Sequence, residues 1–96
     1  MLTIYKYHIP LADTFTLELP TVRCVLTVQE QDEAYRPDSL CIWAHVDTEA
    51  PKRQERLHIV GTGHPIDFPL ETPYIGTVQM GPRLWHVFGP EPQSEP

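Results

Sequence analysis

The residues best suited to bind a ligand lie in one short stretch, Gly61-Thr62-Gly63-His64. Glycine leaves backbone N–H groups free to surround an anion. The glycine loops of nucleotide-binding folds are followed directly by a helix, but the proline at position 65 disfavours helical geometry at His64. Two interpretations therefore stay open: an anion-binding loop without a helix, or glycines that supply positive φ where a strand ends.

If this stretch is a binding loop, its predicted ligand is a small anion. Gly61 and Gly63 would present N–H groups, and Thr62 would donate a hydrogen bond. His64 or Arg56 would supply positive charge. The candidate ligand-binding residues are therefore Gly61, Thr62, Gly63, His64 and Arg56.

The histidines and cysteines do not follow the spacing of a metal site. A structural zinc ion needs four converging ligands, often close together in sequence, and none of the five histidines forms an HxH or HExxH pair. His45, His58 and His86 could still meet across neighbouring strands. We expect histidines on strand faces to serve as hydrogen-bonded structural residues, and we predict neither a metal site nor a cofactor.

Nucleophilic catalysis finds little support in the sequence. The only serines are Ser39 and Ser94, and neither lies in a nucleophile-elbow motif. Cys24 and Cys41 lie inside apolar runs, where a buried thiol is unreactive. We therefore predict a non-enzymatic protein.

The charge balance excludes some partners. Seven Lys+Arg face thirteen Asp+Glu, for a formal net charge of −6, and the only basic cluster is Lys52-Arg53 with Arg56. Binding to duplex nucleic acid needs more clustered positive charge than this, although one pocket could still hold a small anion. The sequence shows neither a signal peptide nor an apolar run long enough to span a membrane, so we expect a cytoplasmic protein.

The elements that must position these residues are strands. "TFTLEL" at 14–19 alternates apolar and polar side chains, as a half-buried strand does, whereas no long window shows the helical period. The fold predicted is all-β, a small antiparallel sandwich or barrel of about six to seven strands within one domain, residues 1–88. The proline-rich segment 89–96 is expected to be a flexible tail. The predicted strands cover residues 2–9, 14–19, 22–30, 39–47, 55–61, 74–80 and 83–88.

One connection, residues 61–73, is too long for a simple turn. Connections of this length are usually functional or form an ordered excursion. Because Ile66, Phe68 and Leu70 alternate within it, we expect it to pack back over the sheet.

The aromatic residues suggest an interface. Tyr5 and Tyr7 share one face of the first predicted strand, and Tyr35 stands beside Arg36 in a polar loop. Tyrosine and arginine often anchor interfaces, whereas we assign Trp43 and Trp85 to the core. These residues predict a homo-oligomer or a partner interface formed by Tyr5, Tyr7, Tyr35 and Arg36.

The chain also resembles a known family of small proteins. The words "TIYKYHIPLADTFTLELP", "LCIWAHVD", "HIVGTGHPI", "YIGTVQM" and "LWHVF" occur in this order over residues 2–88. They are similar to a family encoded mainly by bacteriophages and prophages and catalogued as a domain of unknown function. This sequence departs from the family mainly in a longer 29–39 loop and in its tail. The resemblance implies action in the cytoplasm of an infected bacterium and assigns no catalytic residue.

Three hypotheses for function follow from these observations. The first is a phage-type binding protein, an anti-defence factor that sequesters a small anionic host molecule or immune signal, with residues 61–68 closing over the ligand. The second is a protein inhibitor or adaptor that masks a host enzyme through the 30–38 loop. The third is a structural or virion accessory protein. In the second hypothesis Tyr35 is the anchor, and the acidic residues that face a basic target are Glu30, Asp32, Glu33 and Asp38.

Overall fold

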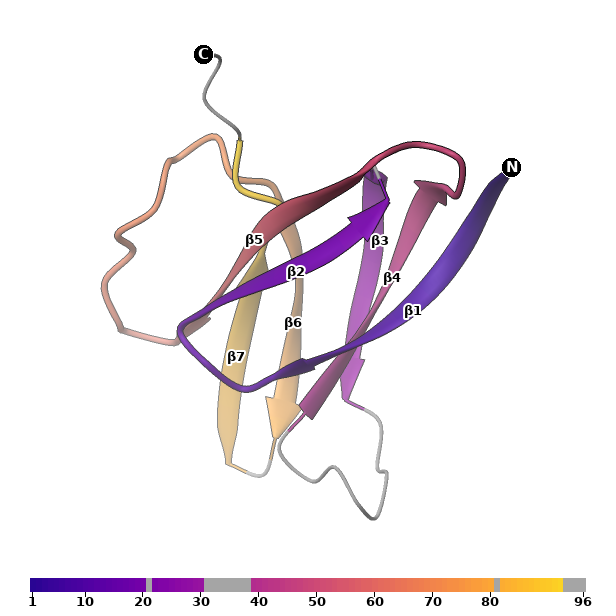
Figure 1. Cartoon of the computed structure of the whole chain (residues 1–96). Helices are drawn as coiled ribbons and strands as arrows, with labels where there is room; N and C mark the ends of the chain where they lie inside the picture. The colour runs from indigo at the N-terminus through magenta and orange to yellow at the C-terminus, as the bar shows by residue number, and fades with distance from the viewer. Residues whose placement is uncertain (21, 31–38, 81, 93–96) are drawn as a thin grey trace.

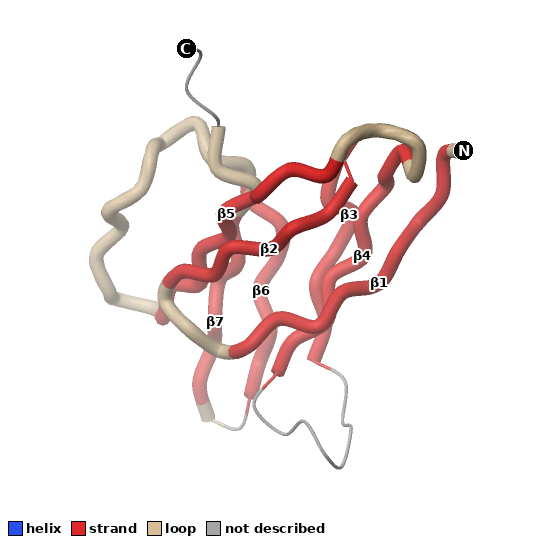
Figure 2. Tube along the Cα trace, in the orientation of Figure 1, coloured by secondary structure: helices blue, strands red, loops and turns tan. Residues whose placement is uncertain are grey.

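The computed structural model describes residues 1–20, 22–30, 39–80 and 82–92. The strands of this part of the chain form two antiparallel sheets (Figure 1), and Figure 2 shows no helix among them. The predicted all-β fold is therefore confirmed. The strands are β1 (Leu2–Pro10), β2 (Thr14–Pro20), β3 (Val22–Glu30), β4 (Ser39–Asp47), β5 (Lys52–Gly61), β6 (Tyr74–Met80) and β7 (Arg83–Phe88).

The strands of the described residues form one three-stranded sheet and one four-stranded sheet. The three-stranded sheet has the order β1-β4-β3, and the four-stranded sheet has the order β2-β5-β7-β6. The short 11–13 connection carries the chain from one sheet to the other, so β1 and β2 meet there and diverge beyond it (Figure 1). At the opposite side β6 approaches β3 so closely that a Cβ on Gly76 would lie 3.0 Å from Val28 Cγ1.

Alternating apolar residues on the inner faces form the core between the sheets. In β5, for example, Leu57 and Ile59 are buried in this core, because every second side chain of a strand points to the same face. The apolar area that these residues remove from water supplies the main stabilising term of the fold. The main buried cluster comprises Ile9, Val28, Leu40, Ile42, Leu57, Ile59, Val78 and Val87.

The two tryptophans differ from each other in position. Trp85 packs against the main core cluster, as expected. The assignment of Trp43 to the core is wrong, because its neighbour Ile42 takes the inward position and Trp43 is only half-buried on the outer face. There the Nζ atom of its register partner Lys6 lies 5.9 Å from the Trp43 ring centroid.

The excursion between β5 and β6, residues 62–73, touches the sheet through one side chain in particular. Phe68 stacks on His58, with ring centroids 4.4 Å apart, and also contacts Phe88. Ile66 and Leu70 remain 52% and 92% exposed, so the expected packing over the sheet is correct for Phe68 and wrong for these two residues. The excursion contains three prolines, which restrict the backbone, and it swings outward past the ends of the strands (Figure 1).

The C-terminal segment continues beyond β7 along the surface of the molecule. Gly89 N donates a hydrogen bond to Pro73 O at 2.8 Å, and Glu91 N donates one to Arg56 O at 2.8 Å. Residues 89–92, the start of the predicted tail, therefore lie against β5 and the end of the excursion. Residues 93–96 lie outside the described part of the chain.

Tyr7 carries a buried hydroxyl group in β1. Its ring packs against the core, but its hydroxyl has no hydrogen-bond partner among the described residues. Burial, and secondarily the neighbouring Tyr5 phenol, raises the pKa of Tyr7 above its ordinary value of 10.0. A buried polar group without a partner costs stability, so this hydroxyl destabilises the folded protein.

Replacing Tyr7 with phenylalanine should raise the free energy of unfolding by about 1 kcal/mol, because it removes the unpaired hydroxyl and keeps the ring. In the wild-type protein, the stability linked to the neutral phenol is complete below pH 10.0 and is lost as pH rises through the raised pKa. Urea denaturation at neutral pH and above pH 10 measures both effects. The control is Tyr5→Phe, because Tyr5 is 42% exposed. An equal gain in that variant would contradict the explanation by burial.

Candidate functional site

The Gly61-Thr62-Gly63-His64 stretch forms a tight turn at the end of β5. His64 N donates a hydrogen bond to Gly61 O at 3.0 Å and so closes the turn. Gly63 has a φ of +88°, a conformation that favours glycine, and a Cβ there would meet no atom within 4 Å. At Gly61 a Cβ would instead lie 3.0 Å from His64 Nδ1 and 3.0 Å from Trp85 Cζ3. Gly63 therefore permits the backbone turn, and Gly61 permits two rings to pack against the chain.

Beside this turn lies a groove, because β7 extends past the end of β5. The last register pair of β5 and β7 is Gly61 with Trp85, so Leu84 and Arg83 pair only with β6. The groove has a volume of about 370 Å³, which falls in the range of small-molecule sites. We call it the turn groove; its lining residues include Gly61, Thr62, His64, Arg83, Leu84 and Trp85.

The turn groove combines one cation with an aromatic wall. Arg83 is exposed and brings a planar guanidinium, a group that matches carboxylate and phosphate oxygens. Trp85 supplies an apolar ring, and no carboxylate belongs to the described lining. The chemistry therefore fits a small anion with an apolar or planar part.

The predicted ligand-binding residues are only partly brought together by the fold. Gly61, Thr62 and His64 line the groove, whereas Gly63 only shapes the turn. Arg56 is exposed on β5 opposite Thr16, outside the described lining of the groove. Arg83 takes the place in the groove that the sequence suggested for Arg56, and only the pairing of β5 with β7 reveals this.

A chain of hydrogen bonds runs from the groove across the outer face of the four-stranded sheet. Thr62 Oγ1 lies 2.8 Å from His86 Nε2, and His86 Nδ1 lies 2.9 Å from Thr77 Oγ1. Thr77 Oγ1 lies 2.5 Å from the Tyr74 hydroxyl. The sequence predicts His86 only as a histidine on a strand face, and no local pattern indicates these partners.

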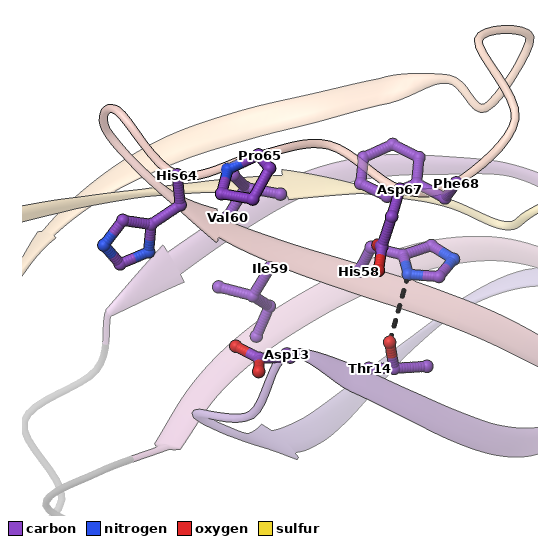
Figure 3. A pocket seen from close by; sticks show the side chains of 9 residues that line it. All are labelled: Asp13, Thr14, His58, Ile59, Val60, His64, Pro65, Asp67 and Phe68. Carbon is purple, nitrogen blue, oxygen red and sulfur yellow. Dashed lines mark hydrogen bonds between the residues drawn. The ribbon is translucent and has the colours of Figure 1, made fainter.

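A second hollow, the His58 cavity, lies between the excursion and β5. It has a volume of about 230 Å³, and Figure 3 shows the side chains that line it, with Thr14 and the His58 ring facing each other. His64 lines both this cavity and the turn groove. The polar and aromatic residues of the cavity are Asp13, Thr14, His58, His64, Asp67 and Phe68.

His58 joins three segments of the chain. Its Nε2 atom lies 2.8 Å from Glu91 Oε2 in the C-terminal segment, and its Nδ1 atom lies 3.2 Å from Thr14 Oγ1 in β2. Phe68 of the excursion stacks on the ring at an interplanar angle of 16°. His58 is only 6% exposed, although its side chain stands on the outer face of β5. His58 therefore holds the excursion and the C-terminal segment against the sheet.

The order hydroxyl, imidazole, carboxylate also occurs in enzymes that activate a nucleophile. Here the carboxylates of Asp13 and Asp67 also line the cavity. Negative charge at this position disfavours the oxyanion that develops during acyl transfer. The His58 arrangement is therefore better suited to holding segments together than to catalysis.

The structure does not bring the histidines together into a metal site. His45 lies on the three-stranded sheet, whereas His58 and His86 lie on the four-stranded sheet. There His58 bonds to Glu91, and His86 bonds to Thr77. Within the described residues there is no group of three or more His, Cys, Asp or Glu side chains arranged to hold a metal ion. This part of the chain also contains no helix that is long and apolar enough to cross a membrane.

Only some of the predicted interface residues lie in the described part of the chain. Tyr5 and Tyr7 contact each other edge to face on β1, with ring centroids 6.3 Å apart. Glu30 is exposed at the end of β3. Leu2, Ile4 and Leu26 form an exposed apolar face that is not predicted from the sequence. The residues of the proposed interfaces that lie outside the described part are Asp32, Glu33, Tyr35, Arg36 and Asp38.

Comparison with known proteins gives a family but no activity. Neither the curated proteins nor the solved structures include a match to this chain. A family model described as Domain of unknown function (DUF7352) matches residues 1–96, which is the whole sequence. The chain therefore belongs to the DUF7352 family.

Proposed function

We propose that this protein is a non-enzymatic binding protein that holds a small anionic molecule in the turn groove. The observation that carries the proposal is the convergence of Thr62 and His64 with Arg83 and Trp85 around one groove of about 370 Å³. Small-ligand sites usually combine apolar walls with a few converging polar groups. The turn groove has both.

The groups of the groove have separate roles in this proposal. Arg83 pairs with the negative charge of the ligand through its guanidinium N–H groups. Trp85 packs against an apolar or planar part, and Thr62 and His64 bond to oxygen atoms at the end near the turn. Gly61 is required because a larger residue would push the His64 and Trp85 rings away from the backbone.

The cellular setting in this proposal is the cytoplasm of a bacterium infected by a phage. The resemblance to proteins encoded by phages and prophages supports it. There the protein would act as an anti-defence factor that sequesters a small host molecule or immune signal. We further propose a homo-oligomer that uses Tyr5 of β1 together with Tyr35 and Arg36; Tyr7, the other tyrosine predicted for this interface, packs against the core. The exposed apolar side chains Leu2 and Ile4 point to the opposite face of β1 from Tyr5, so they would form a separate contact.

Replacing Arg83 with glutamine should weaken binding of the anion about tenfold to one-hundredfold, because one charge-assisted hydrogen bond contributes about 1.5–3 kcal/mol. The matched control is Arg56→Gln, which removes the same charge on β5 outside the described lining of the groove. A ligand is first found by native mass spectrometry and by thermal shift across nucleotides and metabolites. Its affinity for the three proteins is then measured by calorimetry.

The two arginine variants separate the possible outcomes. Loss of binding in Arg56→Gln with normal binding in Arg83→Gln would place the anion on β5 and contradict the groove. If no small molecule shifts the melting temperature, the protein is not a ligand-binding protein of this kind. The alternative is then a protein inhibitor, which the exposed apolar face of Leu2, Ile4 and Leu26 favours.

A further inference from the structure

We propose that the Thr62 hydroxyl donates a hydrogen bond to a phosphate monoester in the turn groove. Tyr74, Thr77 and His86 are positioning residues that direct the Thr62 proton toward this ligand. This inference rests on the proposed function and specifies the group that is recognised. Thr62 is the only member of this chain of hydrogen bonds within the described lining of the groove. The other three members act through it.

The four side chains meet because of a bulge in β6. Residues three apart in a regular strand point to opposite faces, yet the Tyr74 hydroxyl bonds to Thr77. The register of β6 against β7 shifts between Tyr74 and Gly76, and an extra residue of this kind turns the preceding side chain to the other face. The bulge therefore brings Tyr74 to the face of Thr77, whose register partner in β7 is His86.

The direction of the hydrogen bonds follows from the acidity of the phenol. A phenol hydroxyl is a stronger hydrogen-bond donor than an aliphatic hydroxyl, so we assign Tyr74 as the donor to Thr77 Oγ1. Thr77 then donates its single proton to His86 Nδ1, and the neutral ring carries its proton on Nε2. That Nε2–H donates to Thr62 Oγ1. Thr62 accepts within the chain and keeps its own proton for the groove.

The direction of these hydrogen bonds determines which ligand groups Thr62 can bind. Thr62 presents a donor beside the guanidinium of Arg83, so both groups seek acceptor oxygens. A phosphate group offers several such oxygens, whereas an ammonium group offers none. Each bond of a hydrogen-bonded chain also strengthens the next by roughly 10–30%. The groove should therefore prefer phosphate monoesters over carboxylates, which carry less charge, and should reject amines.

The first experiment tests the chain of hydrogen bonds from Tyr74 through Thr77 and His86 to Thr62, which we call the relay. It needs no ligand. Nitrogen-15 NMR of the histidine rings in the full-length protein reports which nitrogen of His86 is protonated. We expect the proton on Nε2 in the wild type and a shift toward Nδ1 in Tyr74→Phe, because Thr77 can then accept from the ring. Tyr5→Phe is the matched control and should leave His86 unchanged. A wild-type ring protonated on Nδ1, or an unchanged ring in Tyr74→Phe, would overturn the relay.

The second experiment tests the donor with adenosine monophosphate, inorganic phosphate and acetate as probes. We expect adenosine monophosphate to bind more tightly than acetate, and Thr62→Val to weaken it about tenfold, the loss of one good hydrogen bond. Thr62→Ser should restore binding, and Tyr74→Phe should weaken it by at most about twofold, because it removes only the strengthening that the chain gives to the Thr62 bond. Thr27→Val, an exposed threonine on β3, is the control.

The outcomes of the two experiments are separable. If none of the three probes binds while His86 shows the expected proton, the phosphate site fails and the relay stands as a structural feature. If adenosine monophosphate binds but Thr62→Val has no effect, the inference about Thr62 is overturned while the groove as a site survives. Equal affinity for acetate and adenosine monophosphate would overturn the assignment to phosphate monoesters.

Discussion

Replacing Gly89 with alanine is expected to lower the free energy of unfolding by about 3 kcal/mol. Gly89 has a φ of +146°, which an L residue with a side chain rarely adopts. A Cβ at this position would also overlap Leu57 Cδ2 and would lie 3.2 Å from Leu57 Cα and 3.3 Å from Arg56 O. Because Leu57 is buried in the core, it cannot move aside without disturbing its neighbours.

The matched control for this substitution is Gly63→Ala. Gly63 also has a positive φ, +88°, but a Cβ there would meet no atom within 4 Å. The control should therefore lose only about 1 kcal/mol, the cost of the backbone conformation alone. Urea denaturation of both variants measures the difference. Equal losses would show that the contact with Leu57 is not the cause.

Replacing His58 with alanine is expected to lower the free energy of unfolding by about 2–4 kcal/mol. The substitution removes the hydrogen bonds to Thr14 and Glu91 and the stacked contact with Phe68. It also releases the excursion and the C-terminal segment from the sheet. Limited proteolysis within residues 62–73 should therefore become faster than in the wild type.

Glu91→Gln separates the charge from the hydrogen bond. The amide oxygen of glutamine can still accept from His58 Nε2, so this variant should lose no more than about 1 kcal/mol. Its excursion should stay as resistant to proteases as the wild type. A His58→Ala protein with wild-type stability would refute the idea that His58 holds these segments together.

The strands could be predicted from the sequence because alternation is a local property. Residues 22–30, 39–47, 74–80 and 83–88 were predicted as strands and form strands with the same bounds. β5 is longer than predicted and begins at Lys52, because its first residues are polar and exposed and show no apolar alternation. The distribution of the strands between two sheets was not predictable, since it depends on contacts far apart in sequence.

The candidate site was predictable only in part for the same reason. The glycines and Pro65 marked a turn that sequence patterns can identify. Arg83 joins that turn only through the register of β5 against β7, and no local pattern indicates this register. Glu91 was missed because its proline-rich surroundings indicate an unfolded tail, whereas its side chain bonds to a buried histidine.

His64 stands between two hollows of opposite electrical character. On one side lie the carboxylates of Asp13 and Asp67, and on the other lies the guanidinium of Arg83. A zwitterion laid across this imidazole would meet complementary charge at both ends, whereas an ion of a single sign would be attracted on one side and repelled on the other. A small anion held in the turn groove, as proposed, would therefore be attracted on the Arg83 side of His64 and kept away from the His58 cavity.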